Sequence, residues 1–312
     1  MVTERNDSYT SVTRVSVVIP VYNAALTVAR ALESVLQQTH PASEIIIVDD
    51  GSTDGSADVV LQVAGLAAQL IRQENGGAAR ARNAGIACVT GDVVALLDAD
   101  DWWDHEKLAR QVAVLERHPE VVATASNWQF ENVGFRAQRA EGLSLATVEC
   151  ECVLRPRGEA VLRVAFSMTA STIAARREVL QRHRFDPALA TAEDRDVWVR
   201  LVAEGPVWFD EAVLTTVGYR ADSLSRIDTD QDCECMIEVL DRYAHLAGPR
   251  AIRRWKAITY AKWAGRLLAD GRPVDASVRA RERWRREWWK PQAWWMLAKC
   301  RWRSRGAGHA RD

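Results

Sequence analysis

The sequence lacks long apolar runs and contains few cysteines. No stretch of its 312 residues approaches 18 consecutive apolar residues, so we expect no helix that crosses a membrane. The polar opening MVTERNDSYTSVTR lacks the apolar core of a secretory signal. The six cysteines form no CxxC pair and no Cys/His spacing typical of a zinc site, which favours reduced thiols. Because 48% of the residues are hydrophobic, we expect a globular cytoplasmic protein with a sizeable core.

The net charge of -1 hides an asymmetry along the chain. From Arg250 onward there are 18 Lys and Arg against 5 Asp and Glu, whereas the preceding part has 23 against 37. Eight of the 13 tryptophans also lie in this basic tail, from Trp255 onward. Long helical patterns begin near residue 229. The composition therefore predicts an α/β domain over residues 1–228 and a helical, Trp- and Arg-rich extension over residues 229–312.

Short apolar segments rich in β-branched residues alternate with helical patterns in the first hundred residues. The segments with the composition of buried strands are Arg14–Tyr22, Glu44–Val48, Leu70–Arg72 and Val93–Leu97. Helices are expected between them, the last of which is the small-residue stretch Ala78–Val89. This βαβαβαβ order predicts a Rossmann-like, doubly wound parallel sheet.

Three carboxylates follow the last of these strands. Asp98, Asp100 and Asp101 stand close together in the stretch LLDADD, and such concentrated negative charge is unfavourable unless a cation or solvent compensates it. Ligands of open α/β sheets bind at the carboxyl ends of the strands. Oxygen ligands with Asp-x-Asp spacing suit Mn²⁺ or Mg²⁺, whose coordination a diphosphate completes. The alternative is an acidic loop in which Asp104 caps the next helix.

Two other acidic stretches allow two interpretations. Asp49 and Asp50 lead into the glycine turn GSTDGS, which brings backbone close to a ligand but lacks the lysine of a phosphate-binding P-loop. The stretch AEDRD at 192–196 opens a helix, where acids ordinarily compensate the helix dipole. The positions of these acids alone do not distinguish a ligand-binding or catalytic site from an ordinary helix start.

Taken together, five stretches in order resemble a family 2 inverting glycosyltransferase of the GT-A fold. They read VSVVIPVYN, VDDGSTDGS, ARNAGI, LLDADD and AEDRDVWVRL. The resemblance covers roughly Arg14 to Ser225 and implies a GT-A nucleotide-sugar-binding domain. It says little about the tail.

The resemblance implies roles for the residues at matching positions. Pro20 and Tyr22 match the loop that contacts the nucleotide base, where an aromatic ring can stack. Asp50 matches the acid that accepts a hydrogen bond from the imide of uracil, with Asp49 supporting the loop. Arg82 and Asn83 match residues that help to hold the donor.

The resemblance also implies a metal and a base. Asp98 and Asp100 match the family's Asp-x-Asp, which contacts the ribose and the metal on the diphosphate, and Asp101 is a further candidate ligand. Which acid touches the Mn²⁺ or Mg²⁺ ion is left open. Asp194 matches the general base that takes a proton from the acceptor hydroxyl. A single displacement would then invert the anomeric configuration.

The resemblance therefore predicts a metal-dependent enzyme that moves a hexosyl or N-acetylhexosaminyl group from a nucleotide-diphosphate sugar, expected to be a UDP-sugar, to a glycan or lipid-linked acceptor. One alternative is an inactive nucleotide-sugar-binding scaffold of a polysaccharide assembly system. A nucleotidyltransferase is a second, although it would need a basic, glycine-rich loop where this chain has PVYNAAL. We expect the loops 167–172 and 128–153 to border the acceptor.

One departure from the family lies after Tyr219-Arg220. Many relatives have a histidine there, whereas this chain has Ala221-Asp222-Ser223. A histidine contact to the metal or diphosphate is therefore not expected at that position.

The tail combines six tryptophans with nine Lys or Arg between Arg281 and Arg305. Tryptophan favours membrane interfaces and basic residues favour anionic leaflets, so we expect helices that lie peripherally on the cytoplasmic membrane face. The alternative is a tail that packs against the acidic body. Nucleic-acid binding is not expected, because the body has no matching motif.

Overall fold

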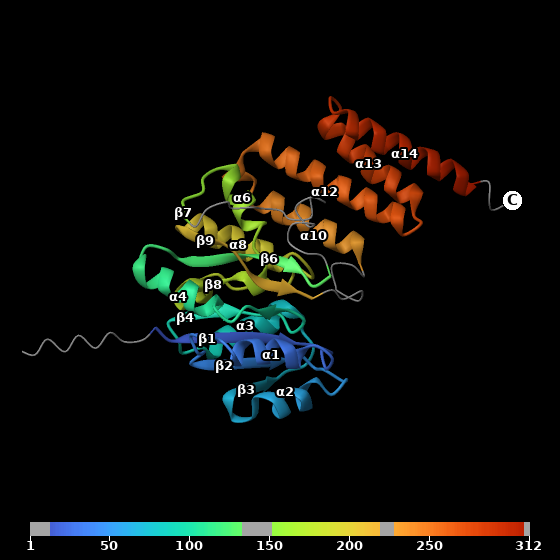
Figure 1. Cartoon of the computed structure of the whole chain (residues 1–312). Helices are drawn as coiled ribbons and strands as arrows, with labels where there is room; N and C mark the ends of the chain where they lie inside the picture. The colour runs from blue at the N-terminus through green and yellow to red at the C-terminus, as the bar shows by residue number, and fades with distance from the viewer. Residues whose placement is uncertain (1–12, 133–151, 219–227, 309–312) are drawn as a thin grey trace, which may run out of the picture.

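A computed structural model describes residues 13–132, 152–218 and 228–308 of the chain. Figure 1 shows a sheet with helices on both faces and a group of helices from the C-terminal part at one end of the molecule. The α/β class and the helical C-terminal region are thus confirmed. The stretch after Tyr219 and most of the loop 128–153 lie outside the described residues.

The four expected strands form a parallel half-sheet in the order β3-β2-β1-β4. Their bounds are β1 Val15–Val21, β2 Glu44–Asp49, β3 Gln69–Arg72 and β4 Val93–Leu96. Val18 pairs with Ile46 on one side and with Leu96 on the other. All four carboxyl ends therefore meet at one edge of the sheet.

Helices cover both faces of this half-sheet, as doubly wound topology requires. The connecting helices are α1 Val28–Leu36, α2 Ser56–Ala64, α3 Ala78–Cys88 and α4 Lys107–Arg117. Alternate residues of β1 point to opposite faces: Val17 packs in the cluster that holds α1, α2 and α4, whereas Val18 packs in the cluster that holds α3. Gly85 allows the close approach of α3, because a Cβ there would lie 2.4 Å from Val18 Cγ1.

The rest of the sheet is mixed, which the prediction of a parallel sheet did not include. Beyond β4 the order continues β8-β6-β9-β5, with β7 also paired to β9. The bounds are β5 Trp102–Trp103, β6 Ala123–Phe130, β7 Cys152–Leu154, β8 Ala174–Arg176 and β9 Val207–Val217. β8 runs antiparallel to both β4 and β6. Strands of two or three residues show too little periodicity to be predicted.

Three helices connect these later strands. They are α6 Glu159–Ala165, α7 Arg177–Arg182 and α8 Glu193–Glu204. Trp198 of α8 is fully buried and meets Phe185 edge to face at 5.8 Å between ring centroids. This packing fixes α8 against the sheet beside the carboxyl ends of the parallel strands.

The C-terminal helices divide into two groups by their packing. They are α10 Thr229–Arg242, α11 Ala244–Ala247, α12 Pro249–Ala269, α13 Pro273–Glu287 and α14 Pro291–Gly308. Val239 and Leu240 of α10 and Ile252 of α12 belong to the same apolar cluster as the sheet. α13 and α14 instead form a hairpin that packs on α12 around Trp263 and Leu267.

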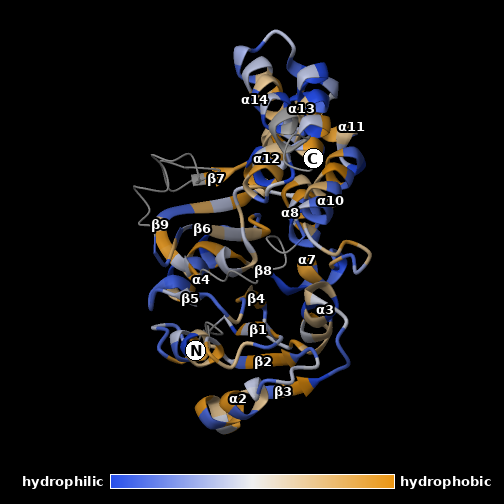
Figure 2. Ribbon diagram, turned by 90° about the vertical axis from the view of Figure 1, so that its right-hand side faces the viewer, coloured by the Kyte–Doolittle hydropathy of each residue, from blue (hydrophilic) through white to orange (hydrophobic). Residues whose placement is uncertain are grey.

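Ion pairs join the first group to the body. Asp196 of α8 is 2% exposed and accepts hydrogen bonds from Arg242 at 3.2 Å and from the Tyr243 hydroxyl at 2.8 Å. The hairpin of α13 and α14 lies far from β1–β3 in both views (Figures 1 and 2). The part of the tail on α10 and α12 therefore pairs with the body, whereas the hairpin projects from it. Within the described residues, no helix combines the length and apolarity needed to span a bilayer.

Candidate active site

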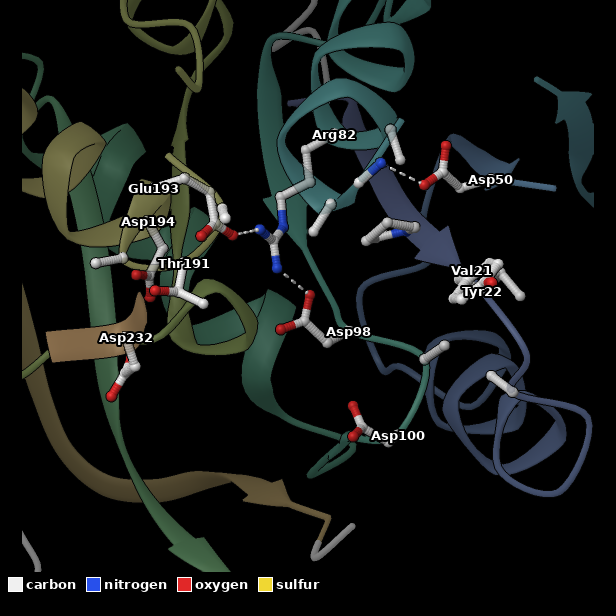
Figure 3. A pocket seen from close by; sticks show the side chains of 18 of the residues that line it. Val21, Tyr22, Asp50, Arg82, Asp98, Asp100, Thr191, Glu193, Asp194 and Asp232 are labelled. Atoms are coloured by element: carbon white, nitrogen blue, oxygen red, sulfur yellow. Dashed lines mark hydrogen bonds and ion pairs between the residues drawn. The ribbon is translucent and has the colours of Figure 1, made fainter. Parts of the chain in front are cut away.

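A cavity of about 790 Å³ opens where the parallel strands end. This volume is in the range typical of small-molecule sites. Seven of the nine residues predicted for the site line the cavity: Pro20, Tyr22, Asp50, Arg82, Asp98, Asp100 and Asp194. Figure 3 shows Tyr22 and Asp50 on one side, Asp194 on the other, and Arg82 with Asp98 between them. The fold thus brings together residues that are far apart in the sequence.

Asp50 lies at the end of β2 and is held rigidly. Its carboxylate accepts hydrogen bonds from Gln73 Nε2 at 2.6 Å and from the backbone N–H groups of Gly76 and Gly77 at 2.9 and 2.8 Å. Gly51 follows with a φ of 78°, and a Cβ there would lie 2.9 Å from the Asn75 backbone nitrogen. Glycine is therefore required for the loop to fold back on Asp50. Tyr22 stands beside this loop with 51% of its surface exposed.

Arg82 links the two halves of the site. The Nη2 group donates to Asp98 Oδ1 at 2.7 Å and the Nη1 group donates to Glu193 Oε1 at 2.6 Å, although Arg82 is only 6% exposed. Burial alone would lower the pKa of the guanidinium, but the carboxylates of Asp98 and Glu193 raise it, so Arg82 stays charged. Burial raises the pKa of Glu193, and Arg82 opposes this effect. The start of α8 is therefore tied to the end of β4.

The loop after β4 is shaped by a buried hydroxyl. Ser171 Oγ accepts a hydrogen bond from the Asp98 N–H at 3.0 Å and donates one to Asp101 Oδ2 at 2.6 Å. Asp101 Oδ1 accepts the Gly218 N–H at 2.9 Å. A Cβ at Gly218 would lie 2.1 Å from the Asp100 carbonyl oxygen, so only glycine fits there. These contacts fix the direction of the Asp98–Asp100 stretch.

Asp101, predicted as a further metal ligand, does not line the cavity. It is 4% exposed, and its two carboxylate oxygens accept hydrogen bonds from Ser171 Oγ and from the Gly218 N–H. Burial and the carboxylates of Asp100 and Asp98 raise the pKa of Asp101 well above its ordinary value. In the structure Asp101 supports the loop, whereas Asp98 and Asp100 line the cavity.

Asn83 also turns away from the cavity. Its amide donates to the Phe185 carbonyl at 2.8 Å and accepts the Phe185 N–H at 2.9 Å, as a strand neighbour would. Asn83 therefore positions the segment before α8 and does not line the cavity. The loop 167–172, expected to border the acceptor, is largely buried and supports the Asp98 loop; Ser171 and Thr172 have no exposed surface.

Asp194 lies in the first turn of α8 and faces the cavity. The preceding Ala192 has a φ of 59°, a left-handed conformation that costs a non-glycine residue on the order of 1 kcal/mol. This turn directs Glu193 to Arg82 and Asp194 toward the open space. Asp194 Oδ1 accepts the Arg195 N–H at 2.7 Å, and the Arg195 side chain donates to the carbonyls of Phe166 and Met168.

Some cavity residues were not predicted. Arg195 lies within the AEDRD motif and Thr191 directly precedes it, and this position was the available signal. Asp232 and Met236 of α10 and Lys262 of α12 also line the cavity, yet they belong to no motif. They reach the site only because α10 and α12 pack against the sheet, a contact that the sequence pattern does not specify.

The acids present fit a metal that shares its coordination with a substrate. Asp100 lines the cavity, and Asp98 does so with 31% of its side chain exposed. Among the described residues, no group of three or more His, Cys, Asp or Glu side chains is arranged to hold a metal by itself. One or two carboxylates suit Mg²⁺ or Mn²⁺, which complete their coordination with phosphate oxygens and water.

Comparison with solved structures identifies the fold. Staphylococcus aureus TarS 1-349 in complex with UDP-GlcNAc superposes with a TM-score of 0.62 at 18% identity, over 86% of this chain and 81% of that chain. The mannosyltransferase PcManGT from Pyrobaculum calidifontis in complex with GDP-Man and Mn²⁺ gives a TM-score of 0.61 at 20% identity, over 97% of this chain and 89% of that chain. The predicted GT-A fold is therefore confirmed.

Sequence relatives point the same way. The uncharacterized glycosyltransferase alr2836 of Nostoc sp. is 51% identical over 106 residues, 33% of each chain. An uncharacterized glycosyltransferase of Rickettsia bellii is 26% identical over 230 residues, 72% of this chain and 32% of that protein. The putative teichuronic acid biosynthesis glycosyltransferase TuaG of Bacillus subtilis is 44% identical over 101 residues, 31% of this chain and 40% of that protein. The chain spans about a third of the length of the first two relatives.

The sequence profile described as Glycosyl transferase family 2 matches residues 16–183, which is more than half of the chain. This stretch contains nearly all of β1 to β4 with their acidic loops, and these loops line one side of the cavity. The chain belongs to glycosyltransferase family 2.

Proposed function

We propose that the protein transfers a sugar from a nucleotide-diphosphate donor, with UDP-sugars as first candidates, to a hydroxyl group of a glycan or lipid-linked acceptor. The observation that carries this proposal is the convergence of Tyr22, Asp50, Asp100 and Asp194 on one cavity. Tyr22 offers a ring that can stack on the nucleotide base, and Asp50 offers a rigidly held hydrogen-bond acceptor to it. The acids after β4 suit a metal-bound diphosphate. Asp194 lies on the other side of the cavity, where it can act as the general base.

The mechanism follows from these positions. Asp194 Oδ1 is held by the Arg195 N–H, which leaves Oδ2 to take the proton of the acceptor hydroxyl as that oxygen attacks the anomeric carbon. The bond from the anomeric carbon to the diphosphate oxygen breaks in the same step, and the nucleoside diphosphate leaves with the electron pair. Arg82 keeps Asp98 and the start of α8 at a fixed separation, so it positions the base relative to the donor. A Mn²⁺ or Mg²⁺ ion held by Asp100 and Asp98 would neutralise charge on the diphosphate. Attack from the Asp194 side would invert the anomeric configuration.

The test is a screen of nucleotide sugars with Mn²⁺ or Mg²⁺, followed by thermal shift and by nucleotide release. Asp194→Asn should keep donor binding and lower turnover by about 10² to 10⁴-fold, because an amide cannot accept the proton. Asp58→Asn is the matched control, since Asp58 is an exposed acid in the first turn of α2. Near-normal turnover of Asp194→Asn would assign this acid to helix capping alone.

The competing function is an inactive scaffold that only binds nucleotide sugars. A purified protein that binds a donor but releases no nucleotide with any acceptor or with water would support the scaffold. The acceptor class is also a proposal. A cell-surface polysaccharide or its lipid-linked precursor is consistent with the biosynthetic name of the relative TuaG.

We further propose that the α13–α14 hairpin contacts an anionic membrane surface. Four exposed tryptophans gather at the turn of this hairpin: Trp288, Trp289, Trp294 and Trp295 are 51 to 62% exposed. Lys299 lies 4.8 Å from the Trp295 ring centroid and Arg253 5.2 Å from that of Trp289. Exposed tryptophan beside cations suits a membrane interface, where each basic residue contributes about 1 kcal/mol. This position would bring the cavity near a lipid-linked acceptor.

Co-sedimentation with vesicles tests this contact. At low salt, the wild type should bind vesicles that contain phosphatidylserine. The variant with all four tryptophans changed to serine should not bind them. Leu26→Ser with Leu66→Ser is the control, because these exposed apolar residues lie in the N-terminal part of the sheet domain. Wild type that stays in the supernatant at low salt contradicts the proposal.

We also propose that a domain of residues 1–228 is followed by an extension of residues 229–312, as the composition indicates. The two parts share the cavity, because residues of α10 and α12 line it.

A further inference from the structure

One end of the cavity is built by helices outside the five family-like stretches. Asp232 and Met236 come from α10, and Lys262 comes from α12. Figure 3 shows Asp232 next to Asp194, on the side of the cavity away from Tyr22 and Asp50. These three residues form one wall of the cavity.

Its position indicates the acceptor side. A nucleotide bound by Tyr22 and Asp50 would place its diphosphate near Asp98 and Asp100, between the two ends of the cavity. The acceptor hydroxyl must reach Asp194 from the remaining side, because the base takes the proton as attack begins opposite the leaving group. The wall of Asp232, Met236 and Lys262 is therefore where the body of an acceptor would lie.

The charges on this wall favour an anion. Lys262 is 56% exposed, and its Nζ lies 3.8 Å from Asp232 Oδ2. The same oxygen accepts a closer hydrogen bond from Arg266 at 2.8 Å. Arg266 is therefore the nearer partner of this oxygen, and Lys262 is held at the longer distance. Within the described residues, Asp232 is the carboxylate found within 4 Å of the Lys262 amine.

Two neighbouring cations also act on the amine of Lys262. Partial burial and the charge of Arg266 lower the pKa of Lys262, while Asp232 opposes the shift. Arg195, which also lines the cavity, acts on Lys262 in the same direction as Arg266. A negatively charged group placed against Lys262 would relieve this repulsion, whereas a neutral sugar would not.

We propose that Lys262 is a specificity residue of the acceptor subsite and binds a negatively charged oxygen group, a carboxylate or a phosphate, of the acceptor. This inference rests on the proposed glycosyl transfer. Met236 lines the same end of the cavity and supplies an apolar surface on which a sugar ring can pack. The hydrogen bond from Arg266 to Asp232 joins α12 to α10 behind this surface.

The experiment compares matched probes that differ in one charged group. They are methyl β-glucuronide against methyl β-glucoside, and glucose 6-phosphate against glucose. Their binding to the full-length protein in the presence of UDP and Mn²⁺ is followed by NMR titration. Binding does not require that a probe present the correct hydroxyl. Wild type should bind the charged member of at least one pair about tenfold more tightly, as expected for one charge-assisted hydrogen bond.

The variants assign this preference to one side chain. Lys262→Gln should reduce the ratio of the two affinities to about one, Lys262→Arg should restore most of it, and Lys262→Glu should favour the neutral probe. Lys256→Gln is the control, because Lys256 lies on the same helix, pairs with Asp241 and does not line the cavity. It should keep the wild-type ratio.

The outcomes separate the two proposals. Preference in the glucuronide pair alone identifies a carboxylate acceptor, and preference in the phosphate pair alone identifies a phosphorylated acceptor. Equal binding within both pairs, or a preference that Lys262→Gln retains, overturns the inference. The proposed transfer itself is judged separately by nucleotide release in the donor screen, so either proposal can fail while the other is measured.

Discussion

Removing the Arg82 side chain should destabilise the protein in a pH-dependent way. The guanidinium is 6% exposed and makes ion pairs of 2.6 and 2.7 Å with Glu193 and Asp98. Breaking a buried pair by removing one partner typically costs about 3–5 kcal/mol, because it leaves an uncompensated charge. Asp98 is 31% exposed and can regain water, whereas Glu193 is only 12% exposed. We therefore expect Arg82→Met to lower the free energy of unfolding by about 3 kcal/mol near neutral pH.

The pH dependence identifies Glu193 as the source of this loss. Burial already raises the pKa of Glu193, and the loss of Arg82 should raise it further. Above the ordinary pKa of glutamate, the folded variant then holds a proton that the unfolded chain has released. Stability therefore falls as pH rises toward the folded pKa, by at most about 1.4 kcal/mol per pH unit. The difference between wild type and Arg82→Met should grow from about pH 5 to about pH 7.

Urea unfolding followed by tryptophan fluorescence measures both effects. Arg80→Met is the matched control, since Arg80 is exposed two residues earlier on α3, and it should change stability by less than about 0.5 kcal/mol. Adding Glu193→Gln to Arg82→Met should remove the slope with pH. A loss below about 1 kcal/mol, or a loss that does not vary with pH, would refute the electrostatic account.

Three further results are expected. Asp100→Asn should abolish the metal dependence of donor binding without lowering the thermal midpoint, because the acidic loop loses a repulsive charge; metal-dependent binding by this variant would rule out Asp100 as a ligand. Lys107 is fully buried beside Trp103, and burial lowers its pKa well below the ordinary value. Below the ordinary lysine pKa, the unfolded chain binds a proton that the folded chain does not, so the stability of the wild type rises with pH. Lys107→Met should therefore be more stable than the wild type near neutral pH. In urea titrations this difference should shrink as pH rises, by up to about 1.4 kcal/mol per pH unit. Gly85→Ala should lower the unfolding free energy by about 1–2 kcal/mol despite its better helix propensity of about 1 kcal/mol, since the new Cβ would clash with Val18; an unchanged urea midpoint would show that α3 can shift.

The parallel half of the sheet could be read from the sequence because its signals are local. β1, β2 and β4 are continuous apolar segments, and each is followed by the turn or acidic residues that form the site. When such strands run parallel, their ends must meet at one edge, which agrees with the family resemblance that assigned Tyr22, Asp50 and Asp98 to one site. Short strands such as β8 gave no comparable signal, and the prediction of a parallel sheet was therefore incomplete.

The roles of neighbouring acids could not be read in this way. Asp100 and Asp101 are adjacent and identical in type, yet Asp100 lines the cavity while Asp101 is buried against Ser171 and Gly218. Local sequence cannot distinguish them, because the difference comes from residues about seventy and more than one hundred positions away, a distance set by the fold. For the same reason, the sequence did not show that Asn83 binds the backbone of Phe185, where the family resemblance had implied a contact with the donor.

The family, the parallel strands and the types of side chain gathered at their ends follow from the sequence, since each depends on a few consecutive residues. The tertiary structure was needed to show that residues of α10 and α12 line the cavity, Lys262 among them, and that Arg82 joins Asp98 to Glu193. Helix patterns specify which face of a helix is apolar, but they do not specify which surface that face will cover. The partner surface is chosen by the packing of the whole chain, and this packing places the polar side chains at the edge of each helix into the site.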